Sequence, residues 1–545
     1  MSAFTFIDLF AGIGGFHAAF RELGGECLYA AEMDPDARAV YEEAWLNDAG
    51  ETIRFARDIN HDVPPIDDIA TIGELAARVA QQGGTIKNIP EKFDVLAAGF
   101  PCQAFSKSGH QKGVLDETRG TLFYNILRIV VERRPKIVFL ENVRNLIGPR
   151  HRDSTFKTII ETLTDLDYVV NNQPTLISPH KIHPDLGGGP QIRERVYILA
   201  IRRDVAANSE PFAGFVYPEW NPKRWKIAET RLKDDAPAAI TEEWLSGLDD
   251  RGRAAELLKL RGTDLSAFSV EGAPWLEAWG AVLRAVVEEG LRDGQAPFPG
   301  HPIWFRVTEG AWMNEQLRDA RAKKQAWKLD FVKKSLKFLE DHEDALDKSM
   351  AWTRIGNLGH NSWMKLEWQA GDARSLDECL IQLRPSGIRI KRDSYTPALV
   401  AINQTPILGA ERRKLTPYEV GRLQGFPDKV YNAMQRARTV DGKRVPQAVN
   451  ASYKQFGNAV HVGAVQYALV QFMNHHFADS DAAATGGLAE LWQECAKTKA
   501  WASVAGVSKS PTPEYSQDEL VVLPRRNELH DNFAVKPELA NAFSR

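Results

Sequence analysis

The chain has 545 residues, of which 43% are hydrophobic and 26% are charged, and its formal net charge at pH 7 is −4. A chain of this length can bury a large core and is expected to divide into two or three domains. The slightly acidic balance argues against a protein that coats nucleic acid non-specifically, because such binding depends on summed positive charge. A local basic cleft is still compatible with this composition.

The cysteines and the apolar runs exclude several further classes of protein. The four cysteines, at positions 27, 102, 379 and 495, form no Cys-x-x-Cys pair and no close cluster with histidine. This pattern indicates neither a disulfide framework nor a structural zinc site, and we expect no metal. No apolar run approaches the ~18 residues of a membrane span, and the N-terminus enters a strand without a basic leader. These features predict a soluble, cytoplasmic protein with no membrane partner.

The first stretch of the chain has the pattern of a strand over 4–10, a glycine turn over 11–16 and a helix over 17–23. Glycines in such a turn let the backbone approach a ligand at a helix N-terminus, although the spacing is not G-x-G-x-x-G and a bare tight turn is the alternative. A second strand over 26–31 ends at Glu32, at the offset where dinucleotide folds place an acid on ribose hydroxyls. Together the two features predict a cofactor that contains adenosine.

The next segments lead to a second candidate site. Asp58 is a possible partner for an adenine amino group, or else an exposed turn aspartate, and residues 71–82 are predicted to form a helix. The apolar run 93–97 reads as a buried parallel strand, and Pro101 then fixes the turn that carries Cys102. A thiol at the carboxyl end of such a strand has the placement of a nucleophile. The alternative is a buried cysteine that acts as a small hydrophobe.

A carboxylate and two arginines follow at neighbouring strand ends. The polar, glycine-bearing stretch 106–120 suits a loop that closes over a substrate, or a merely solvated loop. A helix is predicted over 121–133 and a buried strand over 136–140, so that Glu141 stands at a strand end, as a reacting or a helix-capping acid. Arg193 and Arg195 precede another strand, and alternation places them on one face. Surface ion pairs are the alternative for them.

These segments, taken in order, resemble the motifs of DNA (cytosine-5) methyltransferases of the bacterial restriction-modification type. The resemblance covers residues 4–202 and 395–475. It is carried by FIDLFAGIGGF at 6–16, GFPCQAFS at 99–106, ENV at 141–143, QIRER at 191–195, RKLTP at 413–417, RLQGFP at 422–427 and YKQFGNAV at 453–460.

The resemblance implies a doubly wound, Rossmann-like sheet of an S-adenosylmethionine-dependent methyltransferase with a separate target recognition domain. It implies that Cys102 adds to C6 of a flipped-out cytosine, which makes C5 nucleophilic. Glu141 would supply a proton at N3, Arg195 would contact O2, and Arg193 would support Cys102 and the target nucleotide. The function implied is methyl transfer to C5 of cytosine within a specific DNA sequence, protecting host DNA from a cognate restriction endonuclease.

The same resemblance implies S-adenosylmethionine as cofactor, with S-adenosylhomocysteine as product. Met33 departs from the bulky or aromatic residue usual beside the adenine, which gives a softer thioether contact. The cofactor residues implied are Asp8, Phe10, Gly12, Ile13, Gly15, Glu32, Met33, Asp58, Ile59, Pro101, Leu122, Asn458 and Val460. Ser106, Ser108 and Arg119, in and beside the closing loop, would contact DNA.

No motif falls in the middle of the chain, and the family keeps its target recognition domain there. Its tryptophans are predicted mainly to pack in a core. The basic helix-like stretch 312–343 is predicted to be a solvated face, because acids interleave with its lysines. The better DNA candidate is the extended basic stretch 384–392, with Arg384, Arg389, Lys391 and Arg392 suited to backbone or groove contacts.

The expected domains are a catalytic and cofactor-binding domain at 1–202 and a target recognition domain with hinge at 203–430, whose variable core is about 203–383. Residues 431–477 would complete the catalytic domain, and 478–545 would be a partly flexible tail with a helix at 488–501. We expect a monomer that binds double-stranded DNA. Two alternatives stay open: methylation of transfer RNA, and a non-catalytic DNA-binding regulator that retains a cofactor pocket.

Overall fold

The computed structural model describes residues 2–47, 53–64, 72–100, 122–149, 151–171, 173–217, 220–225, 227, 255, 258–259, 263–323, 325–399 and 404–477. These residues divide into two compact units. The first takes its described residues from within 1–234, 397–403 and 417–512, and the second from within 235–396 and 404–416. The tail from 478 onward, with its predicted helix, lies outside the described residues.

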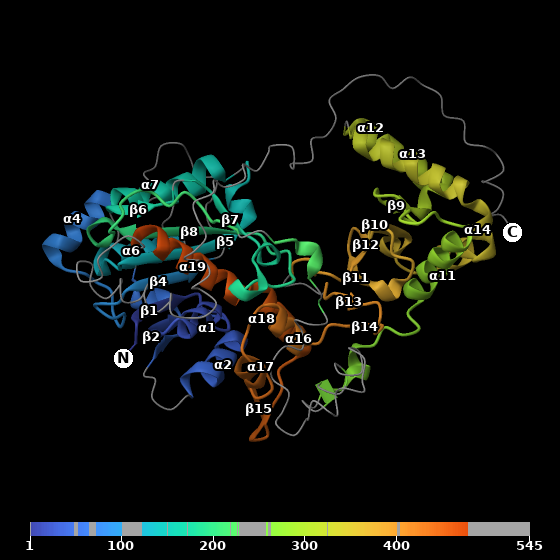
Figure 1. Ribbon diagram of the computed structural model, residues 1–545. Coiled ribbons are helices and arrows are strands. Elements are labelled where there is room, and N and C mark those ends of the chain that lie inside the picture. Colours follow the sequence, from blue (N-terminus) through green and yellow to red (C-terminus); the bar gives the residue numbers. More distant parts are fainter. Residues whose placement is uncertain are drawn as a thin grey trace. The chain divides into compact units, whose positions relative to one another are not determined.

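The first unit is built on an eight-stranded sheet in the order β3-β2-β1-β4-β5-β8-β6, with β7 beside β8 (Figure 1). The strands from β1 to β5 pair in parallel, whereas β8 runs antiparallel to β5, β6 and β7. The elements are β1 (Phe4–Leu9), α1 (Gly15–Glu22), β2 (Gly25–Ala31), α2 (Pro35–Tyr41), β3 (Arg54–Ala56), α3 (Ile59–Asp62), α4 (Ile72–Gln82), β4 (Val95–Gly99), α6 (Leu122–Arg133), β5 (Ile137–Val143), α7 (Lys157–Asp165), β6 (Tyr168–Val170), β7 (Thr175–Ile177) and β8 (Arg195–Arg202). The predicted Rossmann-like sheet is confirmed, with one antiparallel strand that apolar runs do not reveal.

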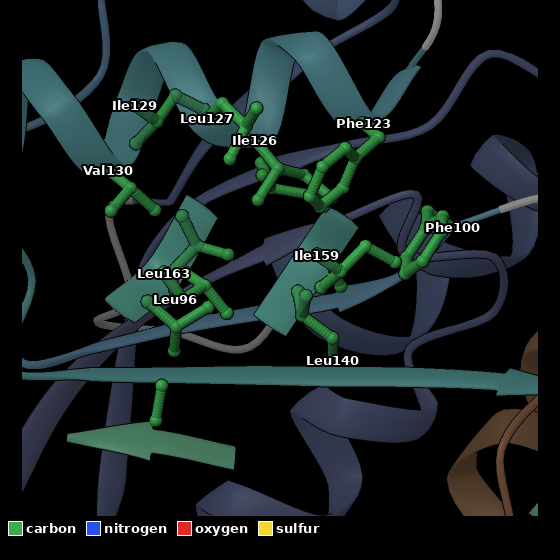
Figure 2. Packing of buried hydrophobic residues seen from close by; sticks show 14 of the residues in the cluster. Leu96, Phe100, Phe123, Ile126, Leu127, Ile129, Val130, Leu140, Ile159 and Leu163 are labelled. Atoms are coloured by element: carbon green, nitrogen blue, oxygen red, sulfur yellow. The ribbon is translucent and has the colours of Figure 1, made fainter. Parts of the chain in front are cut away.

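Helices cover both faces of this sheet, so its strands are apolar on both sides. On one face α4, α6 and α7 pack against residues such as Leu96 and Leu140. Figure 2 shows the α6 side chains of Phe123 and Ile126 directed at this face. On the other face an aromatic layer links α1 to the sheet, with Phe20 5.8 Å from Phe139 between ring centroids. The predicted helices at 71–82 and 121–133 are confirmed as α4 and α6.

The C-terminal part of the first unit completes this second face. Helix α19 (Val462–Phe477) packs against α1, where Gln466 donates to the Glu22 carboxylate at 2.6 Å. The remaining elements are α16 (Pro417–Leu423), α17 (Asp428–Met434), the hairpin β15 (Arg438–Val440) and β16 (Lys443–Val445), and α18 (Val449–Asn458). The helix predicted near 460–477 is therefore present.

The boundary of this unit differs from the one expected at residue 203. The segment after β8 is bound to α19, because Asn208 N–H donates to His476 O at 3.0 Å and Val216 N–H donates to the Gln471 amide oxygen at 2.8 Å. Helix α16 packs closely on α18, where a Cβ on Gly421 would lie 2.8 Å from the Phe456 ring. Residues just past 203 and residues 417–430 thus cluster with the eight-stranded sheet of the first unit.

The second unit has a six-stranded sheet in the order β14-β13-β11-β12-β10-β9, with helices packed into one core. Trp275, Trp279 and Trp368 are buried in that core, as predicted for most of the tryptophans, whereas Trp327 is 41% exposed. The elements are α11 (Pro274–Glu288), β9 (Ile303–Trp304), α12 (Gly310–Ala322), α13 (Ala326–Asp341), α14 (Glu343–Lys348), α15 (Ala351–Gly356), β10 (Lys365–Gln369), β11 (Cys379–Arg384), β12 (Gly387–Arg392), β13 (Ile407–Leu408) and β14 (Arg413–Lys414).

The stretch expected as one helix over 312–343 is two helices, α12 and α13, separated at 323–325. Its lysines are paired with acids, as the interleaved pattern predicts: Lys323 and Lys328 both contact Asp319, at 2.7 and 3.1 Å. Among the described helices none is long and apolar enough to cross a membrane.

Candidate active site

A pocket of about 790 Å³ lies at the carboxyl ends of the parallel strands, where the strand order reverses between β1 and β4. Open α/β sheets bind their ligands at this point, and the volume is that of a small-molecule site. Eleven of the residues implied for the cofactor line it: Phe10, Gly12, Ile13, Gly15, Glu32, Met33, Asp58, Ile59, Leu122, Asn458 and Val460. Glu141 and Arg195 also line it.

The glycine turn between β1 and α1 forms one wall of the pocket. Phe10, Gly12 and Gly14 all have positive φ, at 59°, 57° and 85°. A Cβ at Gly14 would lie 2.2 Å from the Trp45 indole, so only glycine fits there. A Cβ at Gly12 would meet nothing within 4 Å, which leaves this backbone open to a ligand. The turn therefore brings bare backbone to the pocket at the start of a helix.

Glu32 and its neighbours form the adjoining wall. The Glu32 carboxylate accepts the Gly12 N–H at 2.8 Å and the Asp34 N–H at 2.7 Å, which fixes it at the rim. Met33 is 69% exposed beside it, a free thioether where a flat base could pack. Asp58 caps α3 by accepting the Asn60 N–H at 2.9 Å. Glycine backbone, a fixed acid and an exposed thioether in one small pocket fit an adenosine-containing cofactor.

Asp8 is placed differently from the other cofactor candidates. It lies in β1 with no exposed surface, it is not among the described residues that line the pocket, and neither carboxylate oxygen has a hydrogen-bond partner among them. Burial raises the pKa of Asp8 well above 3.8, and the nearby Glu32 charge adds to the effect. In the structure Asp8 is an acid of the sheet interior behind the glycine turn.

Glu141 and Arg195 form a pair at the reacting end of the pocket. Arg195 Nε lies 2.9 Å from Glu141 Oε1, and the side chains are only 16% and 9% exposed. Burial raises the pKa of Glu141, although Arg195 and Arg193 oppose the shift. A carboxyl group held this way keeps a proton at higher pH than a free glutamate does, and the arginine supplies a charge that can stabilise a developing anion.

The strand register places this pair beside the segment that carries Cys102. Gly99, the last residue of β4, is the register partner of Glu141, and a Cβ on Gly99 would lie 3.7 Å from Glu141 Oε2. The Asn142 amide donates to Phe100 O at 2.9 Å and holds the last described residue after β4. Residues 101–121 lie outside the described residues, and with them Pro101, Cys102, Ser106, Ser108 and Arg119.

Arg193 has a role that local alternation does not reveal. It precedes β8, is 2% exposed, and donates to the carbonyl oxygens of Leu399 at 3.1 Å, Gly457 at 3.0 Å and Ala459 at 2.6 Å. Burial lowers the pKa of Arg193 to about 9, so it is a cation at neutral pH. Unlike Arg195, it is not among the described residues that line the pocket; it holds the backbone around Asn458 from behind.

Two pocket residues were missed at the sequence level. Asn142 fixes Phe100 through its hydrogen bond. The Glu-Asn pair at the strand end could have indicated it, but only the acid was assigned a role from the sequence. Lys454 lies on the rim and pairs with Asp34 at 3.1 Å, across 420 residues of chain. No local pattern marks such a pair.

The basic stretch at 384–392 is the turn and second strand of the β11–β12 hairpin. The stretch itself contains no acid, but Glu367, Asp372 and Glu378 from outside it pair with its arginines. Arg384 and Arg389 contact Glu367, and Lys391 Nζ lies 4.1 Å from the Tyr395 ring centroid. Arg392 is instead bound to Asp372 and Glu378, both at 2.7 Å.

Among the described residues, no group of three or more histidine, cysteine or acidic side chains could hold a metal ion.

The family model for C-5 cytosine-specific DNA methylases matches residues 4–255 and 306–473. The chain belongs to this family. Among its relatives, the type II methyltransferase M.AluI of Cellulosimicrobium cellulans is 35% identical, over 86% of this chain and 91% of that protein. M.HpaII of Haemophilus parainfluenzae is 39% identical and M.HhaI of Haemophilus parahaemolyticus 38%, over 43% and 38% of this chain and 54% and 51% of their own lengths.

The methylase therefore transfers a methyl group to C5 of cytosine in DNA, and the predicted family, fold and activity are confirmed. Its family depends on S-adenosylmethionine, and the pocket at the glycine turn is where this chain can hold that cofactor. The family match favours DNA over RNA and an enzyme over a non-catalytic regulator. The roles of individual residues go beyond membership and are proposed below.

Proposed function

We propose that this methylase modifies cytosine in a specific duplex sequence through a covalent adduct between Cys102 and C6 of a flipped-out base. The observation that supports this proposal most directly is the Glu141–Arg195 pair, a buried acid and a cation at the strand end next to the Cys102 turn. A pocket with these two groups can bind the polar edge of a cytosine, where N3 and O2 lie side by side. Flipping the base costs a few kcal/mol, so the protein must bind it tightly.

In the proposed reaction, the Cys102 thiolate forms a bond to C6 and the electrons of the C5–C6 double bond move toward C5. Glu141, whose pKa burial raises, donates a proton to N3 and prevents an anion from building up there. Arg195 contacts O2 and holds Glu141 in place. C5 then takes the methyl group, and N3 returns its proton to Glu141. Transfer of the C5 proton to a water molecule, with expulsion of the Cys102 thiolate from C6, restores the aromatic base.

S-adenosylmethionine supplies the methyl group from its positively charged sulfur when it is bound. Glu32 is proposed to accept from the ribose hydroxyls, Met33 to pack beside the adenine, and Asp58 with Ile59 to meet the adenine edge. The glycine turn at Gly12 would admit the methionine portion. Pro101 would separate the cofactor from the base, and Asn458 and Val460 would close the pocket, held by Arg193 from behind.

The second unit is proposed to be the target recognition domain. Its β11–β12 hairpin offers Arg384, Arg389 and Lys391 to the DNA, and Ser106, Ser108 and Arg119 would contact the target strand. As for the relatives named type II methyltransferases, the proposed role is protection of host DNA within a restriction-modification system. A monomer paired with a separately encoded endonuclease completes the proposal.

The test is transfer of labelled methyl groups from S-adenosylmethionine to duplex DNA and, in parallel, to transfer RNA. We expect label in DNA alone, and bisulfite sequencing of DNA from expressing cells should then reveal one recognition sequence. Cys102→Ser serves as the control for the covalent route, because it should abolish both transfer and trapping on DNA that contains 5-fluorocytosine. Label in RNA alone, or an active Cys102→Ser protein, would contradict the proposal.

A further inference from the structure

A single carboxylate lies among cations on the sheet of the second unit. Glu367 Oε2 lies 2.8 Å from an Arg384 nitrogen and 3.2 Å from an Arg389 nitrogen, and Oε1 lies 3.2 Å from Lys365 Nζ. The Glu367 side chain is 14% exposed and the three cationic side chains are 22–27% exposed. The group is partly shielded, so its charges interact more strongly than pairs in open water.

The strand register explains why these side chains meet. Strands β10 and β12 pair in parallel with Glu367 opposite Arg389, and Arg384 ends the antiparallel neighbour β11. Alternation places the intervening residues Leu366 and Trp368 in the core, on the other side of the sheet. We call the surface made by Lys365, Glu367, Arg384, Arg389 and Lys391 the basic face; it carries four cations and one acid.

We propose that Glu367 is a specificity-determining residue, which positions Arg384 and Arg389 for base edges and weakens their attraction to phosphates of arbitrary sequence. This inference rests on the proposed function, in which the second unit recognises DNA. An arginine has five N–H donors in a rigid fork, so a guanidinium fixed by a carboxylate still has donors for a base such as guanine.

The carboxylate also changes what the face will bind. A phosphate that approaches Arg384 or Arg389 must compete with Glu367 and is repelled by its charge, whereas non-specific binding depends on free cations that neutralise phosphates. Only a sequence that offers well-placed acceptors compensates for this repulsion. The acid therefore costs affinity for all DNA and costs least at the recognition sequence, which is the condition for specificity by exclusion.

The test uses the full-length protein with Glu367→Gln, which keeps the shape of the side chain and removes its charge. Anisotropy titrations with random-sequence duplex at several salt concentrations should show tighter binding, with the slope of log Kobs against log salt steeper by about 0.9 for each cation released to a phosphate. Bisulfite sequencing of DNA from expressing cells should show a broader set of methylated sequences, with discrimination against sites altered at one base pair reduced about tenfold.

Asp319→Asn is the matched control, because Asp319 also holds two cations, Lys323 and Lys328, on helices of the same unit. It should leave the set of methylated sequences unchanged. Glu367→Asp keeps the charge and should stay closer to the wild-type pattern than Glu367→Gln does. A set that is unchanged in Glu367→Gln, or a uniform loss of methylation at all sites, would overturn the role of Glu367.

The double variant Arg384→Ala with Arg389→Ala separates this inference from the proposed function beneath it. If that variant methylates the same sequences with the same affinity, the second unit does not read DNA through this face and the proposed recognition function itself fails. If it loses sequence-specific methylation while Glu367→Gln keeps the wild-type pattern, the recognition function stands and only the role of Glu367 is refuted.

Discussion

Arg193 offers a sharp test of how the cofactor pocket is held together. Its guanidinium donates to three carbonyl oxygens, and two of them, on Gly457 and Ala459, flank Asn458 at the pocket wall. Arg193→Lys keeps a positive charge but replaces a planar fork by a single ammonium group, which cannot reach all three oxygens. We expect the variant to fold, to be less stable, and to bind the cofactor more weakly because the wall at Asn458 is no longer fixed.

The magnitude follows from the contacts. A hydrogen bond to a charged group contributes about 1.5–3 kcal/mol, so losing one or two of three contacts costs about 1.5–6 kcal/mol in all. Part of this loss appears as a lower free energy of unfolding. If about 1.4 kcal/mol of this loss appears as weaker binding at the pocket, the Kd for S-adenosylhomocysteine rises tenfold.

Calorimetric titration with S-adenosylhomocysteine measures the affinity without turnover, and urea unfolding measures the stability. Arg202→Lys is the control, because Arg202 lies at the other end of β8, pairs with Asp204 and is not among the described residues that line the pocket. Its Kd should match the wild-type value. If Arg193→Lys binds the product as tightly as the wild type while unfolding more easily, Arg193 is a core residue only and its link to the pocket is refuted.

Further expectations concern the reacting groups and the sheet behind them. Glu141→Gln should lower single-turnover methylation about 10²–10⁴-fold, because an amide cannot transfer a proton to N3; a loss below threefold would exclude the acid role. Arg195→Ala should slow adduct formation on 5-fluorocytosine DNA about 10²-fold, and an unchanged rate would remove Arg195 from the reaction. Because burial raises the pKa of Asp8 above 3.8, folding takes up a proton, and the free energy of unfolding should fall as pH rises above that value. Asp8→Asn should make the fall smaller in urea titrations across pH, and an equal fall in both proteins would contradict it. Gly15→Ala places a Cβ 2.6 Å from Val460 Cγ2 and should weaken product binding by about 1 kcal/mol in the same calorimetric assay; unchanged binding would show that the wall yields freely.

The parts of the fold that could be predicted are those encoded by neighbouring residues. Apolar runs marked the buried strands, and the acids Glu32 and Glu141 follow such runs directly, so their places at the pocket could be inferred. Strand direction could not, because an apolar run reads the same either way, and the antiparallel β8 was therefore missed.

The role of Arg193 could not be predicted from the sequence, because its contacts are long-range. Alternation placed Arg193 and Arg195 together, yet β8 begins only at Arg195, and the partners of Arg193 lie 206 to 266 residues further along the chain. A backbone carbonyl leaves no mark in a sequence, because every residue has one. The hydrogen bonds that give Arg193 its structural role therefore cannot be predicted from the identity of the residues that accept them.

The charge of the basic face could not be predicted from the sequence either. The sequence of residues 384–392 contains no acid, but local composition covers only neighbours along the chain. Strand pairing brings Glu367 to Arg384 and Arg389, which lie 17 and 22 residues away in the sequence. A shift of one residue in the β10–β12 register would place Leu366 or Trp368 opposite Arg389 and leave the arginine without its acid. The charge of this surface is therefore a property of the register, and a register shift in either strand would alter it without changing the net charge of the chain.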